Sequence, residues 1–339
     1  MKKRHVNIPI FIPHLGCPNN CVFCNQRTIS GHGDFKIESV RREIDDALST
    51  LDVNTEREIA FFGGSFTGID RELMIELLDL AESYVERGLV GEIRLSTRPD
   101  YISDEILDIL SKYSVKTIEL GLQSLNDCVL FASKRGHSSE CALKACRAIK
   151  ERGFSLIGQM MIGLPKSSAN DEIMTAELIC RSGADGARVY PTVVFAETEL
   201  AEMMQGGEYE PLDTDEAVER TKNVLGIFDS YGVPCIRVGL CASENLRNAS
   251  LAIAGATHSA IGEMAMSELF YERICKELDA RSVCGGSLVI YVARGATSKA
   301  ISQKKKNKEK ICKKYCLESL KVLEKNELLG YNIILEYIK

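Results

Sequence analysis

The feature that most constrains the fold is a regular alternation of short apolar runs with longer segments of helical periodicity. Strands are predicted at residues 6–12, 57–63, 92–97, 116–122, 154–163 and 185–191. Helices are predicted between them, at residues 36–50, 72–86, 103–113 and 170–181, with others up to about residue 152. Because each strand is continuously apolar, we expect a parallel α/β sheet that is buried on both faces. These six βα units close as a barrel or lie open as a doubly wound sheet, and periodicity does not decide between the two.

The rhythm of the sequence changes towards its C-terminal end. The later predicted elements are helices at 213–231 and 259–279, a lysine-rich helix, and strands at 233–240, 287–293 and 331–338. A seventh strand therefore completes the repeating pattern, and a smaller mixed unit follows it. We predict a core barrel over residues 1–242 and a small α+β appendage over residues 243–339.

Composition is that of an ordinary globular chain, with 45% apolar and 27% charged residues. No apolar run approaches the length of a membrane span, and the first residues lack the pattern of a secretory signal. We therefore expect a cytoplasmic protein without membrane contact. In that compartment its 13 cysteines are expected to be reduced thiols.

Three cysteines follow the first predicted strand, Cys17, Cys21 and Cys24, with the spacing C-x3-C-x2-C. Loops after the strands of parallel α/β folds form their active sites. This loop offers three thiolates and no obvious fourth ligand, whereas structural zinc and ferredoxin clusters take four. Three cysteines on a [4Fe–4S] cluster leave one iron open for a reactant. We predict such a cluster, with zinc completed by His14 or His32 as the alternative.

Glycines and polar residues mark the ends of further predicted strands. They are Gly63, Gly64 and Ser65 on the second strand, Ser96 and Arg98 on the third, Glu119 and Gln123 on the fourth, and Tyr190 on the sixth. The glycine pair removes two Cβ atoms where the backbone approaches a ligand. Glu119 and Gln123 occupy a strand that favours apolar residues, so they belong to a site or satisfy each other in the core.

The cysteine loop resembles that of the radical S-adenosylmethionine (SAM) superfamily, whose members carry C-x3-C-x-aromatic-C after the first strand; Phe23 is the aromatic residue here. The resemblance implies a partial (β/α)6 barrel, a [4Fe–4S] cluster on Cys17, Cys21 and Cys24, and SAM on the fourth iron. It further implies reductive cleavage of SAM to a 5′-deoxyadenosyl radical that abstracts hydrogen from a substrate. The residues implied to bind SAM are Gly63, Gly64, Ser65, Ser96, Arg98 and Gln123.

Longer segments resemble one branch of that superfamily, the radical domain of the Elongator catalytic subunit. They are ELGLQSLND at 119–127, RGHS at 135–138, MMIGLP at 160–165 and VYPTVVFAETELAEMMQGGEYEP at 189–211. In that family an acetyl-CoA-binding acyltransferase domain acts with the radical domain on the wobble uridine of tRNA. This chain ends before such a domain would fit, so we expect a short bacterial-type relative, with an acyltransferase in trans or a different substrate. The resemblance places Tyr190 in the barrel cavity, to position substrate or relay a hydrogen atom.

Charge is distributed unevenly along the chain, whose net charge is −6. Residues 294–325 contain eleven Lys or Arg and three acidic residues, whereas residues 1–293 contain 30 basic and 43 acidic residues. The basic segment 298–314 indicates an anionic partner, and we expect tRNA, with ferredoxin or flavodoxin as electron donor. Tyr315 is the one aromatic platform near it, so base-specific reading is not supported. The alternatives are a radical SAM enzyme for a porphyrin, peptide or small metabolite, and a non-enzymatic metal- and RNA-binding protein.

Overall fold

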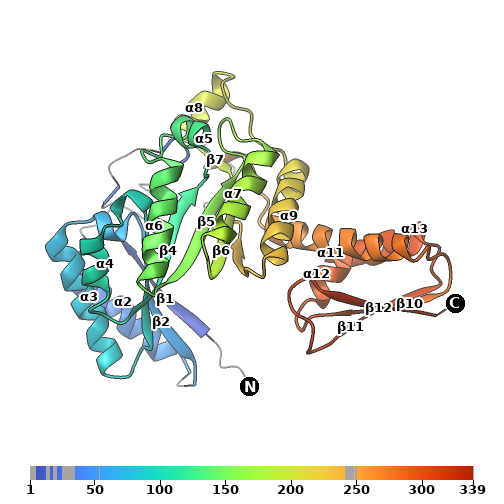
Figure 1. The fold of residues 1–339 in the computed structure, drawn as a ribbon, viewed down its shortest axis with the longest axis horizontal. Helices are drawn as coiled ribbons and strands as arrows, with labels where there is room; N and C mark the ends of the chain where they lie inside the picture. The colour runs from blue at the N-terminus through green and yellow to red at the C-terminus, as the bar shows by residue number, and fades with distance from the viewer. Residues whose placement is uncertain are drawn as a thin grey trace.

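The computed structural model describes residues 5–12, 16–17, 21–24, 35–52, 54–240, 248 and 250–338. Its largest element is a sheet of seven parallel strands that curls into a half-barrel (Figure 1). In sheet order the strands are β1 His5–Ile12, β2 Glu56–Gly63, β3 Glu92–Thr97, β4 Val115–Gln123, β5 Ser155–Ile162, β6 Gly186–Pro191 and β8 Cys235–Val238. Sheet order follows chain order, and β1 and β8 are the two edges. The predicted partial barrel is confirmed, rather than a closed barrel or a doubly wound sheet.

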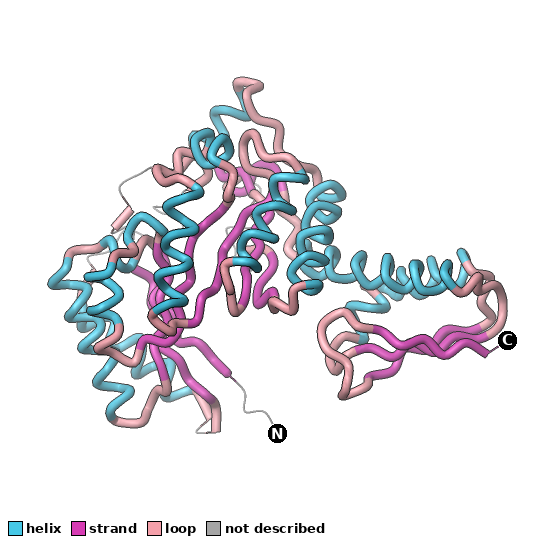
Figure 2. The backbone as a smooth tube through the Cα atoms, in the orientation of Figure 1, coloured by secondary structure: helices cyan, strands magenta, loops and turns pink. Residues whose placement is uncertain are grey.

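Helices that follow the strands line the outer face of the half-barrel. They are α2 Ile37–Thr50, α3 Arg71–Glu86, α4 Asp104–Leu110, α6 Ser139–Glu151, α7 Ala169–Arg181 and α9 Thr214–Ser230. Because every crossover turns in the same direction, the helices fall on one side of the sheet (Figure 1, Figure 2). Helix starts are encoded locally: at α7, Ser168 and Asp171 form a reciprocal capping box.

The two faces of the sheet differ in character, because alternate strand residues point to opposite sides. Ile8, Ile10 and Ile12 of β1 join the main hydrophobic core beneath the helices. The inner face carries charge instead, including Arg94 on β3 and Glu119 on β4. The strands are therefore not apolar throughout, as the sequence analysis expected. Their outer-facing residues are apolar, and their inner-facing residues build a polar surface.

Shorter elements surround the carboxyl ends of the strands. They are the 3-10 helices η1 Phe66–Gly68 and η2 Pro99–Tyr101, the helices α5 Asp127–Ala132 and α8 Glu199–Gln205, and the antiparallel strands β7 Val193–Phe195 and β9 Ala252–Gly255. Most of these elements are missing from the sequence prediction, because segments of three to seven residues are too short to show a period.

The C-terminal part of the chain has a hydrophobic core of its own, and we call residues 270–338 the appendage. Its elements are the second half of α11 Ile261–Ala280, β10 Ser287–Val292, α12 Thr297–Ile301, η3 Gln303–Lys305, α13 Lys306–Lys314, β11 Ser319–Glu324 and β12 Ile333–Ile338. Strand β10 is central, parallel to β11 and antiparallel to β12. The predicted α+β appendage is confirmed. Strand β11 was not predicted, because its alternating apolar and charged residues follow the lysine-rich helix almost directly.

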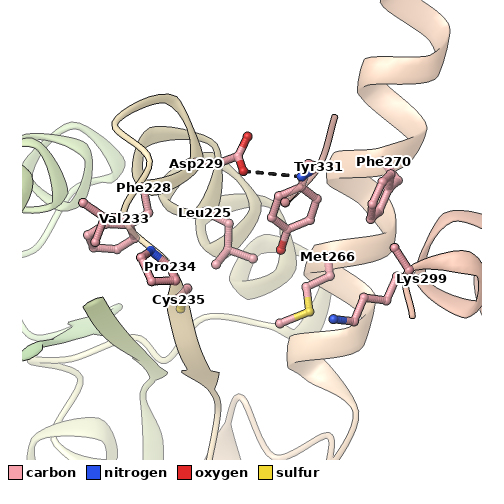
Figure 3. A pocket seen from close by; sticks show the side chains of 12 residues that line it. Leu225, Phe228, Asp229, Val233, Pro234, Cys235, Met266, Phe270, Lys299 and Tyr331 are labelled. Atoms are coloured by element: carbon pink, nitrogen blue, oxygen red, sulfur yellow. Dashed lines mark hydrogen bonds between the residues drawn. The ribbon is translucent and has the colours of Figure 1, made fainter. Parts of the chain in front are cut away.

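Helix α11 joins the two parts of the molecule, since its first half packs near α9 and its second half enters the appendage core. A cavity of about 210 Å³ lies at this junction (Figure 3). Beside it, the Tyr331 N–H donates to Asp229 Oδ1 at 3.4 Å, and Arg273 pairs with the same carboxylate at 2.8 Å. The domain division at 242/243 falls in residues 241–247, outside the described residues, and stays a prediction. Within the described ranges, no helix combines the length and apolar character needed to cross a membrane.

Candidate active site

The cysteine loop follows β1 at the carboxyl ends of the strands. Cys21 is buried, Cys17 and Cys24 are partly exposed, and all three are free thiols. The loop is fixed to the rest of the half-barrel by its backbone, since the Val22 N–H donates to the Ser133 carbonyl at 3.3 Å. The structure therefore places the three predicted ligands on one short, anchored loop. His14 and His32, the alternative zinc ligands, lie outside the described residues.

Gly16 allows this loop to approach the turn after β2, a role that sequence reasoning missed. Its φ is +79°, and a Cβ at this position would lie 2.3 Å from the Ser65 carbonyl oxygen and 2.7 Å from the Gly68 carbonyl carbon. Both neighbours are backbone atoms, so neither can rotate away. The glycine directly before Cys17 is the only sequence signal for this contact.

The predicted Gly-Gly turn ends β2 beside the end of β1. Gly63 has φ +108°, and a Cβ there would lie 2.4 Å from the Ile12 carbonyl oxygen. The Gly64 N–H donates to that same carbonyl at 3.2 Å. The buried Ser65 hydroxyl lies 2.8 Å from Thr97 Oγ1 and accepts the Arg98 N–H at 3.1 Å. Ser65 thus ties the ends of β2 and β3 together and sets the position of Arg98.

Two buried arginines face Cys21. Arg98 Nη1 lies 4.0 Å from Cys21 Sγ, and its Nε and Nη2 each donate to Asp100 at 2.9 Å. Arg135 Nη1 donates to Cys21 Sγ at 3.2 Å, and its Nη2 donates to the Gly121 carbonyl at 2.6 Å. Arg98 Nη2 also donates to the Arg135 carbonyl, which couples the two residues. Sequence reasoning identified Arg98 and missed Arg135, although Arg135 begins the RGHS segment.

The charge balance of this site fits anionic sulfur. Burial raises the pKa of the Cys17 thiol, and the positive charges of Arg98 and Arg135 oppose that rise. A buried cation is costly unless an anion accompanies it. Asp100 provides one carboxylate, and metal-bound thiolates would provide the remaining negative charge. The donor set of three cysteines with two guanidiniums beside them therefore fits a [4Fe–4S] cluster.

Gln123 ends β4 in a strained conformation. Its φ is +65°, a region that non-glycine residues enter at a cost of about 1–3 kcal/mol. The side-chain Oε1 is buried and has no hydrogen-bond partner among the described residues. Such strain and an orphaned acceptor are typical of functional sites. They support Gln123 as a residue that contacts a ligand.

Deeper on the inner face, Glu119 is the centre of a charged network. This fully buried carboxylate accepts from Arg94 Nη1 at 3.0 Å, Arg188 Nη2 at 2.6 Å and Gln159 Nε2 at 2.8 Å. Its partners are thus on β3, β5 and β6, and the sequence-based pairing of Glu119 with Gln123 is replaced by this network. Through it the curvature of the half-barrel brings distant strands into contact.

Two further predicted residues, Ser96 and Tyr190, border this network. Ser96 Oγ lies 3.4 Å from Gln159 Nε2. Tyr190 Oη accepts a hydrogen bond from Arg188 Nη1 at 3.4 Å, and burial raises the pKa of its hydroxyl. Both residues therefore lie on the inner face, away from the contacts that hold Arg98 at the cysteine loop.

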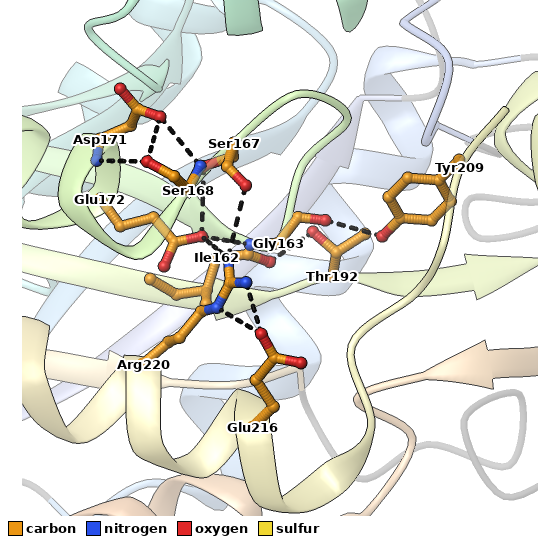
Figure 4. A network of polar contacts seen from close by, with 10 residues as sticks. All are labelled: Ile162, Gly163, Ser167, Ser168, Asp171, Glu172, Thr192, Tyr209, Glu216 and Arg220. Atoms are coloured by element: carbon orange, nitrogen blue, oxygen red, sulfur yellow. Dashed lines mark hydrogen bonds and ion pairs between the residues drawn. The ribbon is translucent and has the colours of Figure 1, made fainter.

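A third polar cluster fixes the turn after β5 (Figure 4). The Gly163 N–H donates to the buried Glu172 carboxylate at 2.7 Å, and its carbonyl accepts from Tyr209 Oη at 2.7 Å. Ser167 and Arg220 also bond to Glu172, at 3.2 and 3.5 Å. Gly163 has φ +76°, so this turn is held on both sides by side chains from later elements. Tyr209 belongs to the GEYEP segment, whose role the sequence did not reveal.

Comparison with protein families gives two adjacent matches. The model of the radical SAM superfamily matches residues 11–179, and that of the radical SAM C-terminal domain matches residues 184–270. Together they span the half-barrel and the first half of α11.

Relatives with this pattern include proteins of archaea and yeast. An uncharacterized protein of Methanocaldococcus jannaschii is 30% identical over 246 residues, which cover 68% of this chain and 74% of that protein. A tRNA uridine(34) acetyltransferase of Methanocaldococcus infernus is 36% identical over 128 residues, which cover 37% of this chain and 24% of the acetyltransferase. Elongator complex protein 3 of Saccharomyces cerevisiae is 24% identical over 261 residues, covering 65% of this chain and 47% of that protein. The aligned segments thus span less than half of the last two relatives.

A solved structure has the same fold. The archaeal Elongator protein Elp3 of Methanocaldococcus infernus superposes with a TM-score of 0.60 at 21% identity, over 83% of this chain and 64% of that chain. The similarity extends beyond the half-barrel, since 83% of 339 residues is more than the strands and helices before residue 240 contain.

Proposed function

Because the chain belongs to the radical SAM superfamily and its radical domain is Elongator-like, we propose that it cleaves SAM reductively at a [4Fe–4S] cluster on Cys17, Cys21 and Cys24. Membership of this superfamily makes the chain an enzyme, which sets aside the non-enzymatic alternative. The observation that carries the proposal is the anchored cysteine loop with two buried guanidiniums facing Cys21.

The residues around the loop have separable roles in this proposal. Cys17, Cys21 and Cys24 hold the cluster, while Arg98 and Arg135 stabilise the negative charge of its thiolates. When bound, the cluster and SAM supply a 5′-deoxyadenosyl radical that abstracts a hydrogen atom from the substrate. The chain contributes a fixed geometry and a largely buried site for this chemistry.

Further residues form the pocket for SAM and substrate. Gly63 and Gly64 present backbone without Cβ atoms, and Ser65 fixes the strand end that carries Arg98. Gln123 offers its orphaned Oε1 as an acceptor for a hydroxyl or amino group. Ser96 and Tyr190 lie on the inner face, where Tyr190 positions the substrate or relays a hydrogen atom.

The proposed substrate is tRNA, with ferredoxin or flavodoxin as electron donor. Support comes from the aligned tRNA uridine(34) acetyltransferase and from the basic segment 298–314 in the appendage. Lys304, Lys305 and Lys306 are exposed there and suited to phosphate contacts. The rival substrates, a porphyrin, peptide or small metabolite, do not call for such a segment.

The deciding experiment is anaerobic reconstitution with iron and sulfide, followed by electron paramagnetic resonance of the dithionite-reduced protein. We expect a [4Fe–4S] signal that changes when SAM is added, with formation of methionine and 5′-deoxyadenosine. Cys24→Ala should lose the signal, whereas Cys284→Ala, which removes an exposed cysteine of the appendage, should retain it. Uptake of zinc alone, or a signal that ignores SAM, would contradict the proposal.

A further inference from the structure

Two arginines lie side by side on the inner face of the half-barrel. Arg188 of β6 and Arg237 of β8 are register partners on neighbouring strands, which run about 5 Å apart. The register shifts directly before them, because Ala187 pairs with Cys235 whereas Arg188 pairs with Arg237. The extra residue, Ile236, thus turns Arg237 to the same face as Arg188. Bulges that re-aim a side chain in this way are frequent next to active sites.

Adjacent like charges destabilise a sheet, so this pair requires compensation. Glu119 pairs with Arg188 at 2.6 Å. The same carboxylate also accepts from Arg94 at 3.0 Å and from Gln159 at 2.8 Å. Glu119 is therefore shared between two guanidiniums before Arg237 is considered, and the inner face between β6 and β8 favours a further anion.

Arg188 is held in place and retains donor capacity. Its guanidinium carbon lies 5.3 Å from the centroid of the Phe62 ring, a cation–π contact that fixes the plane of the group. Its Nε is buried and has no hydrogen-bond partner within the described ranges of the chain. The side chain is 12% exposed, so it is largely shielded from water. A guanidinium fixed in this way binds an oxyanion at low entropic cost.

This pair is separate from the arginines of the cysteine loop. Arg98 and Arg135 contact Cys21, whereas Arg188 contacts Glu119 and Tyr190. We propose that Arg188 and Arg237 bind an oxyanion of the substrate, a carboxylate or a phosphate, beside the Tyr190 hydroxyl. This inference rests on the proposed function and deepens it, because it assigns a chemical class to one end of the substrate. The bound oxyanion would hold the neighbouring part of the substrate against Tyr190.

Equilibrium dialysis of the reconstituted protein against radiolabelled inorganic phosphate, at constant ionic strength, tests the site directly. We expect saturable binding by the wild-type protein that weakens about tenfold to a hundredfold in Arg237→Gln, as for loss of a charge-assisted hydrogen bond. Arg42→Gln, which removes an exposed guanidinium from α2, should bind phosphate like the wild type. Acetate that displaces phosphate at lower concentration than phosphate itself would identify the natural group as a carboxylate, and the opposite order as a phosphate.

A second measurement covers the case in which Arg237→Gln does not fold. Phosphate should then slow modification of Arg237 by phenylglyoxal in the wild-type protein, measured by peptide mass spectrometry. Unchanged modification, equal phosphate binding by a folded Arg237→Gln, or displacement of phosphate by SAM would overturn the inference. Dialysis does not depend on SAM cleavage. Phosphate binding in a protein that fails to cleave SAM would therefore refute the proposed function and leave the oxyanion site in place.

Discussion

The half-barrel and the appendage use charge in opposite ways. In the half-barrel, Glu119 is fully buried and each of its oxygens is bonded to a partner on another strand. In the appendage, the ion pair between Lys314 and Asp279 joins side chains that are 46% and 57% exposed. Buried charge in a fixed geometry acts on one point of a ligand. Exposed charge acts over a Debye length and is screened by salt.

The same contrast corrects one expectation about the appendage. Tyr315, the aromatic residue predicted as a platform beside the basic segment, is buried in the appendage core. Its hydroxyl donates to Asp279 Oδ1 at 2.6 Å and to the Cys275 carbonyl at 3.1 Å. Tyr315 therefore stabilises the appendage and does not stack on bases. What the appendage offers an RNA is the charge of its lysines.

The largest expected effect is the loss of stability on removing the buried carboxylate from the half-barrel. Glu119→Gln leaves Arg94 and Arg188 without their shared anion, which should lower the free energy of unfolding by about 3–5 kcal/mol. In the appendage, Glu327→Gln removes the exposed partner of Lys325 and should change it by less than about 0.5 kcal/mol. Urea denaturation followed by circular dichroism measures both. Equal losses in the two variants would remove the contrast between the regions.

The next effect concerns the close backbone contact at the cysteine loop. Gly16→Ala places a Cβ 2.3 Å from the Ser65 carbonyl oxygen, so the loop must shift and its iron content after reconstitution should fall sharply. Gly153→Ala is the matched control, because its φ of +80° is similar and no atom lies within 4 Å of the added Cβ. That control should lose about 1 kcal/mol of stability and bind iron normally. Normal iron binding by Gly16→Ala would show that the approach of the loop to the β2 turn is not required.

The sequence predicted the features that local patterns encode. The strand and helix alternation follows from periodicity, and the half-barrel was expected from the cysteine spacing and the order of later motifs. Cys17, Cys21 and Cys24 could be singled out because all three fall within eight residues. Gly63 was visible because the pair Gly63-Gly64 stands at the end of an apolar run.

Contacts between distant residues could not be predicted in this way. Arg135 is 114 residues from Cys21 in the chain, and nothing local to either residue indicates their contact. The alignment of Arg188 with Arg237 depends on one unpaired residue, Ile236, which periodicity cannot locate. The charged inner face was missed for a related reason: single charged residues within apolar strands do not reveal which partners they meet across a curved sheet.

The smallest expected effect tests the exposed charge of the appendage. Replacing Lys304, Lys305 and Lys306 with Gln should weaken tRNA binding and lower the slope of log affinity against log salt by up to about 3. The turn that presents them is strained, since Lys304 and Lys305 have φ of +52° and +60°, which is consistent with selection for function over stability. The matched triple variant at the exposed lysines 36, 112 and 116 of the half-barrel should keep the wild-type slope. Filter binding over a salt series measures both, and equal slopes would assign the RNA contact, and with it the contrast between the two regions, to another surface.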